Sequence, residues 1–332
     1  MNGTRWLCAA LIVGAVALVG CGKRTMRFEL VPVEEKLEQQ VISEGDAGAF
    51  TSDKIAVVTV SGLISNAKAS GILSGGSNAV SDFRERLDAI AQDASVKAVL
   101  LRLNTPGGTV TASDMMYKDL LTFKAKTHKP VVVEMMDVCA SGGYYLSCGA
   151  DYRMAYPTTI TGSIGVIIQT LNFHGTLDKL GISAKAITSR ENKDMGSPLR
   201  PMTANDEKLL KGLVDEFYAG FLAIVKSSPQ HVKDSDWDMV TDGRVFSGNE
   251  ALRLGLIDQI GTLDDAIAKA KGLAGIKHAK LVMYTHKDEH LGSAYAAAPA
   301  GGTAINMINV NVAEGALAPT MHPQFLYLWT GQ

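Results

Sequence analysis

Ser141 stands where a β-branched run meets a helix of small residues, in the stretch VCASGGYYLSCGAD at residues 138–151. Gly142 and Gly143 follow it, and glycines at such a place leave room for a substrate backbone and for amide groups that face an oxyanion. Open α/β sheets carry their active sites at the carboxyl ends of parallel strands, which favours a nucleophilic role. A serine that only caps the helix would leave the same local pattern. This stretch alone therefore leaves nucleophile and cap open.

A second glycine turn, NTPGG at residues 104–108, also follows an apolar run of strand type. If both runs are parallel strands, the amides near Gly108 and Gly142 can face one crevice and act as two donors to an oxyanion. Glycine turns after strands are common, so neither turn is specific by itself. Together they predict an oxyanion hole next to Ser141.

A serine nucleophile needs a base that accepts its proton. The seven histidines of the chain are His128, His174, His231, His278, His286, His290 and His322. Only His174 lies near the expected site in sequence order, and its setting, NFHGTLDKL, is typical of a surface histidine at a helix start. Lys193, in SRENKDMGSP, is the other candidate, because burial can lower the pKa of a lysine from ~10.4 towards neutrality. A solvated lysine beside Glu191 and Asp194 is the alternative interpretation.

Apolar runs that alternate with helix-type patterns predict the scaffold for these residues. Strands are expected at 55–64, 96–103 and 130–136, and helices at 80–90 and 112–123. Crossover helices between apolar strands predict an α/β fold with a mostly parallel sheet, built from repeated βαβ units.

Further elements are expected after Ser141. Short strands are predicted at Tyr152–Ala155 and in AKAIT at 184–188, with a helix before Gly181. The TAND segment at 203–206 has the pattern of a capping box, with Asp in place of the usual Glu, and opens a long helix through Ile224. A helix that ends near Gly272 and a strand at 281–284 complete the expected fold.

The first 21 residues, MNGTRWLCAALIVGAVALVGC, have the organisation of a signal peptide, with Arg5 before an apolar run. The run from Trp6 to Val19 is shorter than the ~20 residues that a spanning helix usually needs, which favours cleavage over an uncleaved anchor. The LVGC segment ending at Cys21 resembles a bacterial lipobox, in which the cysteine carries the lipid. We expect Cys21 to tether the catalytic part to a membrane of the bacterial cell envelope, outside the cytoplasm.

Composition limits the partners and cofactors of the 332-residue chain. Its formal charge is −2 and it has no basic block, so we expect no nucleic acid among its partners. Outside the signal segment only Cys139 and Cys148 remain, and their expected separation along a helix argues against a disulfide. We expect both to be buried small apolar residues. None of the usual metal-ligand spacings occurs, so we expect neither a metal nor another cofactor.

Five segments resemble the signal peptide peptidase A and protease IV family of serine peptidases. They are NTPGGTVTASD at 104–114, VCASGGYYLSCGAD at 138–151, TGSIGVI at 161–167, NKDMGSP at 192–198 and GRVFSGNEALRLGLID at 243–258. With their spacing they span most of residues 54–273. Two cysteines stand where the family pattern has small residues, which should alter packing and not chemistry.

The resemblance implies a crotonase-like and Clp-protease-like fold, with repeated ββα or βαβ units and a mostly parallel sheet, and a Ser/Lys dyad. Ser141 matches the nucleophile and Lys193 the general base. Gly108 and Gly142 match the oxyanion-hole positions, and Ser163 matches a residue that orients the lysine.

The resemblance also implies partners. The chain has one copy of the catalytic region and so resembles the short members of the family. These are expected to form a ring-like homo-oligomer, in which Lys193 reaches the Ser141 of a neighbouring subunit. The expected substrates are cleaved signal peptides and unfolded or damaged envelope proteins.

Two other interpretations stay open. An acyl-CoA hydratase or thioesterase could use paired glycine amides on the same scaffold, but acyl-CoA pools are cytoplasmic and the expected signal peptide would export this chain. A non-catalytic lipoprotein could use the crotonase-type scaffold for binding. That interpretation would be favoured if either dyad position were replaced, and neither is.

The expected organisation has four parts: a lipoprotein signal peptide at 1–21, a linker at 22–53, a serine peptidase domain at 54–290 and a flexible tail at 291–332. The tail contains the apolar segment FLYLW at 325–329. We expect this segment to be able to occupy a substrate groove and restrain activity.

Overall fold

A computed structural model describes residues 37–45, 52–67, 78–228, 231–286 and 325–330. The chain divides into two compact units, residues 1–35 and 36–332, and all the described residues belong to the second. The expected signal peptide and Cys21 lie outside the described residues. Within the described ranges, none of the helices is both long enough and apolar enough to cross a membrane.

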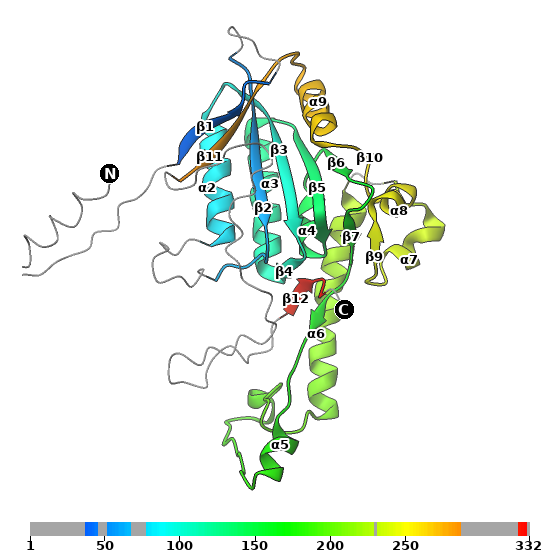
Figure 1. Cartoon of the computed structure of the whole chain (residues 1–332). Helices are drawn as coiled ribbons and strands as arrows, with labels where there is room; N and C mark the ends of the chain where they lie inside the picture. Colours follow the sequence, from blue (N-terminus) through cyan, green and yellow to red (C-terminus); the bar gives the residue numbers. More distant parts are fainter. Residues whose placement is uncertain (1–36, 46–51, 68–77, 229–230, 287–324, 331–332) are drawn as a thin grey trace, which may run out of the picture. The chain divides into compact units, whose positions relative to one another are not determined.

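A nine-stranded sheet forms the centre of the described part of the chain (Figure 1). Its strands are β1 (Glu38–Ser43), β2 (Lys54–Ser61), β3 (Val96–Thr105), β5 (Val131–Ala140), β6 (Tyr152–Ala155), β7 (Ile160–Gly162), β9 (Val245–Ser247), β10 (Gln259–Ile260) and β11 (Lys280–Thr285). The order is β1-β11-β2-β3-β5-β6-β10, with β7 beside β5 and β9 beside β7. Only the β1–β11 and β7–β9 pairs of this sheet are antiparallel. The mostly parallel sheet with crossover helices confirms the predicted α/β class.

Helices cover both faces of this sheet because successive strand residues point to opposite sides. One face packs against α2 (Ala79–Gln92), α3 (Val110–Thr127) and α4 (Gly142–Ser147), and the other against α9 (Leu263–Ala274). In β3, Leu101 belongs to the core cluster under α2 and α3, whereas Leu100 belongs to the cluster under α9. Both side chains are 0% exposed, as the continuous apolar strand runs predict.

The remaining helices are α5 (His174–Lys179), η3 (Glu191–Asp194), α6 (Ala204–Ser227), η4 (Asp234–Asp236), α7 (Trp237–Val240) and α8 (Gly248–Arg253). The predicted capping box is present at the start of α6, where Thr203 and Asp206 exchange hydrogen bonds of 3.0 Å. Phe221 and Val225, in the last turns of α6, join the core under α3 and α4. Asp206 and Phe221 are therefore separated by roughly 22 Å along the helix axis, and only the later residue reaches the core.

A second, three-stranded sheet joins distant parts of the chain. It consists of β4 (Gly107–Thr109), β8 (Ile167–Ile168) and β12 (Phe325–Leu328). β12 lies in the middle and is antiparallel to both neighbours. Strand β12, drawn in red in Figure 1, thus lies next to the glycine turn at residues 104–108.

Three segments differ from the expected organisation. β1 lies inside the segment 22–53 that was expected to be a linker, and it pairs with β11 at the edge of the sheet. Phe325–Leu328, in the tail that was expected to be flexible, forms β12. The prediction of a strand at 184–188 is wrong: these residues form no strand, and Ile187 is 95% exposed. A strand needs a partner edge, and the described residues provide none there.

Candidate active site

Ser141 sits between β5 and α4 in an unusual backbone conformation. Its φ is 52° and its ψ is −111°, a region that non-glycine residues rarely adopt and that costs about 1–3 kcal/mol. The surrounding backbone holds this conformation, since the amide of Ser141 donates to the Gly162 carbonyl at 2.8 Å and its carbonyl accepts from the Tyr145 amide at 2.8 Å. Strain of this kind concentrates at functional sites.

The Ser141 side chain makes no capping hydrogen bond to α4. The capping interpretation is therefore wrong, and the hydroxyl is not committed to the helix. The residue is only 1% exposed with β12 in place.

The two glycine turns begin side by side because Thr105 of β3 is paired with Cys139 of β5. A Cβ on Gly142 would lie 3.2 Å from the Gly108 amide nitrogen. Gly107, with a φ of +102°, has no room for a Cβ, which would overlap the Tyr327 carbonyl oxygen and lie 2.6 Å from the Gly142 amide nitrogen. The predicted oxyanion residues Gly108 and Gly142 are thus neighbours next to Ser141.

Ser163 occupies the equivalent place at the end of the neighbouring strand. Ala140 of β5 pairs with Gly162 of β7, so Ser141 and Ser163 each follow one member of this pair. Ser163 also has a positive φ, 50°, and its amide donates to the Arg244 carbonyl at 2.8 Å. It is 8% exposed, and the strand pairing places it beside Ser141.

Lys193 does not join this group within one chain. It lies in η3, and every residue from 178 to 193 is exposed. Among the described residues, no hydrogen bond or ion pair links Lys193 to Ser141. His174 also stays at the surface, where its Nε2 lies 3.2 Å from Asp178 Oδ2. Neither base candidate therefore reaches Ser141 of its own chain.

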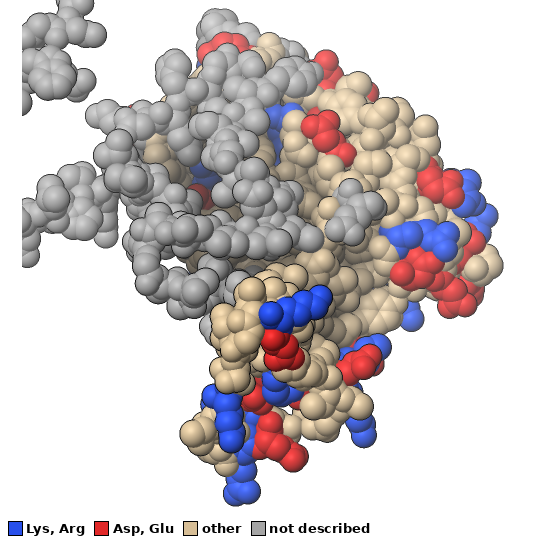
Figure 2. All heavy atoms as spheres, turned by 60° about the horizontal axis from the view of Figure 1, so that its bottom comes forward, with Lys and Arg blue, Asp and Glu red and all other residues tan. Residues whose placement is uncertain are grey.

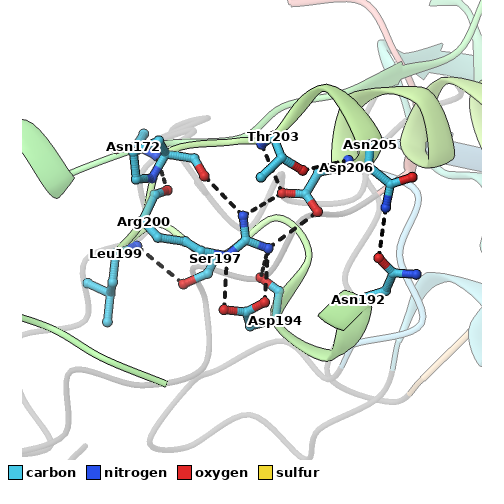
Figure 3. A network of polar contacts seen from close by, with 10 residues as sticks. Asn172, Asn192, Asp194, Ser197, Leu199, Arg200, Thr203, Asn205 and Asp206 are labelled. Carbon is cyan, nitrogen blue, oxygen red and sulfur yellow. Dashed lines mark hydrogen bonds and ion pairs between the residues drawn. The ribbon is translucent and has the colours of Figure 1, made fainter. Parts of the chain in front are cut away.

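An ion-pair network holds the segment that carries Lys193 (Figure 3). Arg200 donates to both carboxylate oxygens of Asp194 at 2.9 Å and to Asp206 at 2.5 and 3.3 Å. These hydrogen bonds from Arg200 hold the pKa of Asp194 below its ordinary value. Together with a hydrogen bond from the Thr203 amide, they lower the pKa of Asp206 to about 2. The capping box at Asp206 is evident from the local sequence pattern, whereas the pairing of Arg200 with Asp194 and Asp206 is not.

The tail strand β12 lies along the glycine turn at residues 104–108. Tyr327 pairs with Gly108 and Leu328 with Gly107, and the Trp329 amide donates to the Pro106 carbonyl at 2.9 Å. The Tyr327 carbonyl oxygen and the Gly142 amide nitrogen both lie within 2.6 Å of the point where a Gly107 Cβ would be. A backbone carbonyl of the tail is therefore close to the oxyanion residues.

Tyr327 fills an aromatic pocket between α4 and α6. Its ring stacks on Tyr145 with centroids 5.1 Å apart and lies 4.7 Å from the ring of Phe221. Its hydroxyl donates to the Phe217 carbonyl at 3.0 Å, and the residue is 2% exposed. The pocket was not predicted, because its walls come from two helices that are distant in the sequence.

Two cysteines of the described part of the chain are packing residues of the interior. Cys139 and Cys148 are free and buried, and burial raises the pKa of both thiols. This confirms the prediction that both are buried packing residues. Among the described residues, no group of His, Cys, Asp and Glu side chains is arranged to hold a metal ion.

Residues 124–277 match the model of peptidase family S49. A protein from Synechocystis that is named as a protease is 34% identical over 238 residues, which cover 72% of this chain and 80% of the relative. A Methanocaldococcus jannaschii protein, also named as a protease, is 38% identical over 60% of this chain and 63% of its own length. An Enterococcus faecium protein named as a signal peptide peptidase is 29% identical over 89% of this chain and 88% of its own. The chain therefore belongs to peptidase family S49, a family of serine peptidases that hydrolyse peptide bonds.

Proposed function

We propose that this chain is a membrane-tethered serine endopeptidase with a Ser141/Lys193 dyad, which degrades cleaved signal peptides and other apolar envelope peptides. One observation carries the catalytic part of this proposal: Ser141 is strained, does not cap its helix and lies beside the amides of Gly108 and Gly142. Membership of a serine peptidase family supports it.

The residues have complementary chemical roles. The amine of Lys193 accepts the proton of the Ser141 hydroxyl, and the oxygen attacks the peptide carbonyl. The amides of Gly108 and Gly142 stabilise the resulting oxyanion. Lys193 then gives its proton to the leaving amine, and water, deprotonated in the same way, releases the acyl group from Ser141. Ser163 orients the lysine.

A neighbouring subunit supplies the lysine in this proposal. Residues 171–199, the segment that carries Lys193, expose large apolar side chains to solvent. On a single chain, an exposed apolar surface of this kind is energetically unfavourable in water. These side chains are Leu171 at 47%, Leu180 at 67%, Ile182 at 50%, Ile187 at 95% and Leu199 at 45% exposed. A ring of copies would cover these residues and bring each Lys193 to the Ser141 of the next subunit. If the site is shared between subunits, a single chain should lack a base next to Ser141, and this is the arrangement described above.

The position and composition of the tail strand β12 support the proposal that the substrate is an extended apolar peptide. β12 occupies a place where a peptide could add a strand between β4 and β8, with main-chain pairing for affinity and a pocket for a side chain. Phe325, Leu326, Tyr327 and Leu328 form this strand, so the groove accepts an apolar sequence without charge. Signal-peptide cores share that composition. We propose that β12 must leave before a substrate enters.

The tether is proposed from the sequence. Cys21 would carry the lipid, with the peptidase domain outside the cytoplasm. A tethered enzyme meets membrane-derived peptides where they are released. The relative named as a signal peptide peptidase supports this choice of substrate.

A fluorogenic apolar peptide tests the proposal. The protein without residues 1–21 is compared with its Ser141→Ala and Lys193→Ala variants, all checked for folding by circular dichroism. Each variant should lose about 10³-fold or more in kcat/KM. Ser227→Ala and Lys211→Ala, at exposed positions of α6, should keep full activity. Equal activity in all five proteins would exclude the dyad and favour the non-catalytic binding scaffold.

A further inference from the structure

Arg200 connects two carboxylates from different elements (Figure 3). Asp194 is the last residue of η3, and Asp206 belongs to the first turn of α6. The planar guanidinium binds Asp194 through two nitrogens, Nε and Nη2, and reaches Asp206 through Nη1. A guanidinium suits this arrangement because its donors have a fixed fork geometry that a lysine ammonium lacks.

The network fixes the turn next to Lys193. Asn192, on the other side of Lys193, accepts a hydrogen bond from Asn205 of α6 at 2.9 Å. Asn192 is thus bound directly to the first turn of α6, and Asp194 is bound to the same turn through Arg200. The same helix packs Phe221 into the core near α4. The lysine turn is therefore attached to the body of the subunit by a regular helix.

The network also sets the charge beside the lysine. An unpaired carboxylate next to a lysine favours its ammonium form, which cannot accept a proton. Arg200 pairs with the Asp194 carboxylate at 2.9 Å and also with the Asp206 carboxylate, so its one positive charge lowers the net charge of these two carboxylates from −2 to −1. Removal of Arg200 would leave both carboxylates without this partner, and one of them belongs to the residue that follows Lys193 in the sequence.

We propose that Arg200 is a positioning residue for Lys193, which fixes the lysine turn against α6 and compensates the charge of Asp194 so that the lysine can serve as a base. This inference rests on the proposed function, since it takes Lys193 as the base. In the part of the chain that the structure describes, Arg200 forms hydrogen bonds with Asp194 and Asp206 and none with Ser141 or Lys193, so it would act through the turn.

Other charged groups surround the turn. Arg190 and Glu191 lie on the same turn, and Glu207 and Lys208 belong to the first turns of α6. On α5, whose first turn adjoins the segment through the Phe173 amide and the Pro198 carbonyl, His174 pairs with Asp178 and Lys179 follows. Figure 2 shows both signs of charge interspersed on the face that it presents. In the described residues, Asp194 is the carboxylate that is both adjacent to Lys193 and bound by Arg200.

The pH dependence of kcat tests the inference in the whole protein without residues 1–21. For Arg200→Gln we expect kcat to fall and the pH of half-maximal kcat to rise by about one unit, because the Asp194 carboxylate is then unpaired. The double variant Arg200→Gln/Asp194→Asn should return this pH to the parent value while kcat stays low. Arg200→Lys keeps the positive charge but loses the fork geometry of the guanidinium. It should therefore lower kcat without shifting the pH of half-maximal kcat. Arg253→Gln, which breaks the exposed pair of Arg253 with Glu250, is the matched control and should change neither.

Two results would overturn the inference. One is an unchanged half-maximal pH in a folded Arg200→Gln variant; the other is a shift that Asp194→Asn does not reverse. If Arg200→Gln does not fold, Arg200→Lys decides the positioning role, and an undiminished kcat in that variant would overturn it. Full activity of Lys193→Ala would instead refute the proposed dyad, so the two failures are distinguishable.

Discussion

Tyr327 pairs with Gly108 across the antiparallel β12–β4 ladder, so the end of the chain lies against a residue of the proposed oxyanion hole. In the proposed function a peptide substrate binds at the place of this apolar strand. Substrate and tail would then compete for one surface, and the population of the open groove would set the apparent affinity.

Deletion of residues 325–332 should raise activity on a short apolar peptide. If the tail fills the groove nine-tenths of the time, kcat/KM rises about tenfold, because the apparent affinity scales with the open fraction. The melting temperature should fall, since Tyr327 no longer packs on Tyr145 and Phe221. Steady-state kinetics and calorimetry measure the two effects. Tyr327→Phe, which keeps the ring, should have the smaller effect, and unchanged activity after the deletion would exclude autoinhibition.

Mixing two inactive variants should restore activity if the dyad forms between subunits. A Lys193→Ala chain supplies Ser141 and a Ser141→Ala chain supplies Lys193. With equal random mixing in a ring, about a quarter of the sites combine both intact residues. The assay follows peptidase activity after the two proteins are dissociated and reassembled together. Activity that never exceeds that of the separate variants would argue for a dyad within one chain.

Gly142→Ala should lower the rate by ~10²–10³-fold, because steric overlap would displace the amide of residue 142 from the oxyanion site. The new Cβ would overlap the Ser113 hydroxyl and lie 3.2 Å from the Gly108 amide nitrogen. Loss of one oxyanion donor typically costs ~10²–10³ in rate. Adding Ser113→Ala removes the overlapping oxygen, so the double variant should regain part of the activity. A fully active Gly142→Ala enzyme would contradict this geometry.

Asp93 should make the stability of the fold depend on acid pH. Burial opposes ionisation of its carboxylate, but hydrogen bonds from Ser95, Gln39 and Tyr284 outweigh that effect and lower its pKa well below the ordinary range. A carboxylate with a lowered folded pKa stabilises the fold above its unfolded pKa of ~3.9, and this contribution is lost as the pH falls towards the folded value.

Urea unfolding of Asp93→Asn at several pH values measures this contribution. The difference in unfolding free energy from the parent should be largest at neutral pH and should shrink below about pH 4. Asp264→Asn, at an exposed position of α9, should differ little from the parent throughout. A difference for Asp93→Asn that stays constant from pH 7 to pH 3 would contradict the role of its charge.

The sequence determined the features that depend on local pattern. Apolar runs of strand length, separated by helix periodicity, were sufficient for the parallel α/β sheet. Strand ends in such a sheet meet at one edge, which is why the neighbourhood of Ser141, Gly108 and Gly142 was predictable. The capping box at Thr203 was equally local, because its two hydrogen bonds lie within four residues.

The tertiary structure decided the features that need a distant partner. β1 and β12 have weak or ambiguous patterns, and each becomes a strand only because another edge is available. The segment at 184–188 finds no such edge among the described residues, forms no regular secondary structure and is exposed. The strain at Ser141 and the aromatic pocket for Tyr327 likewise arise from segments that only folding brings together. Non-local pairing is absent from any short window of sequence, and so these features became visible only in the folded chain.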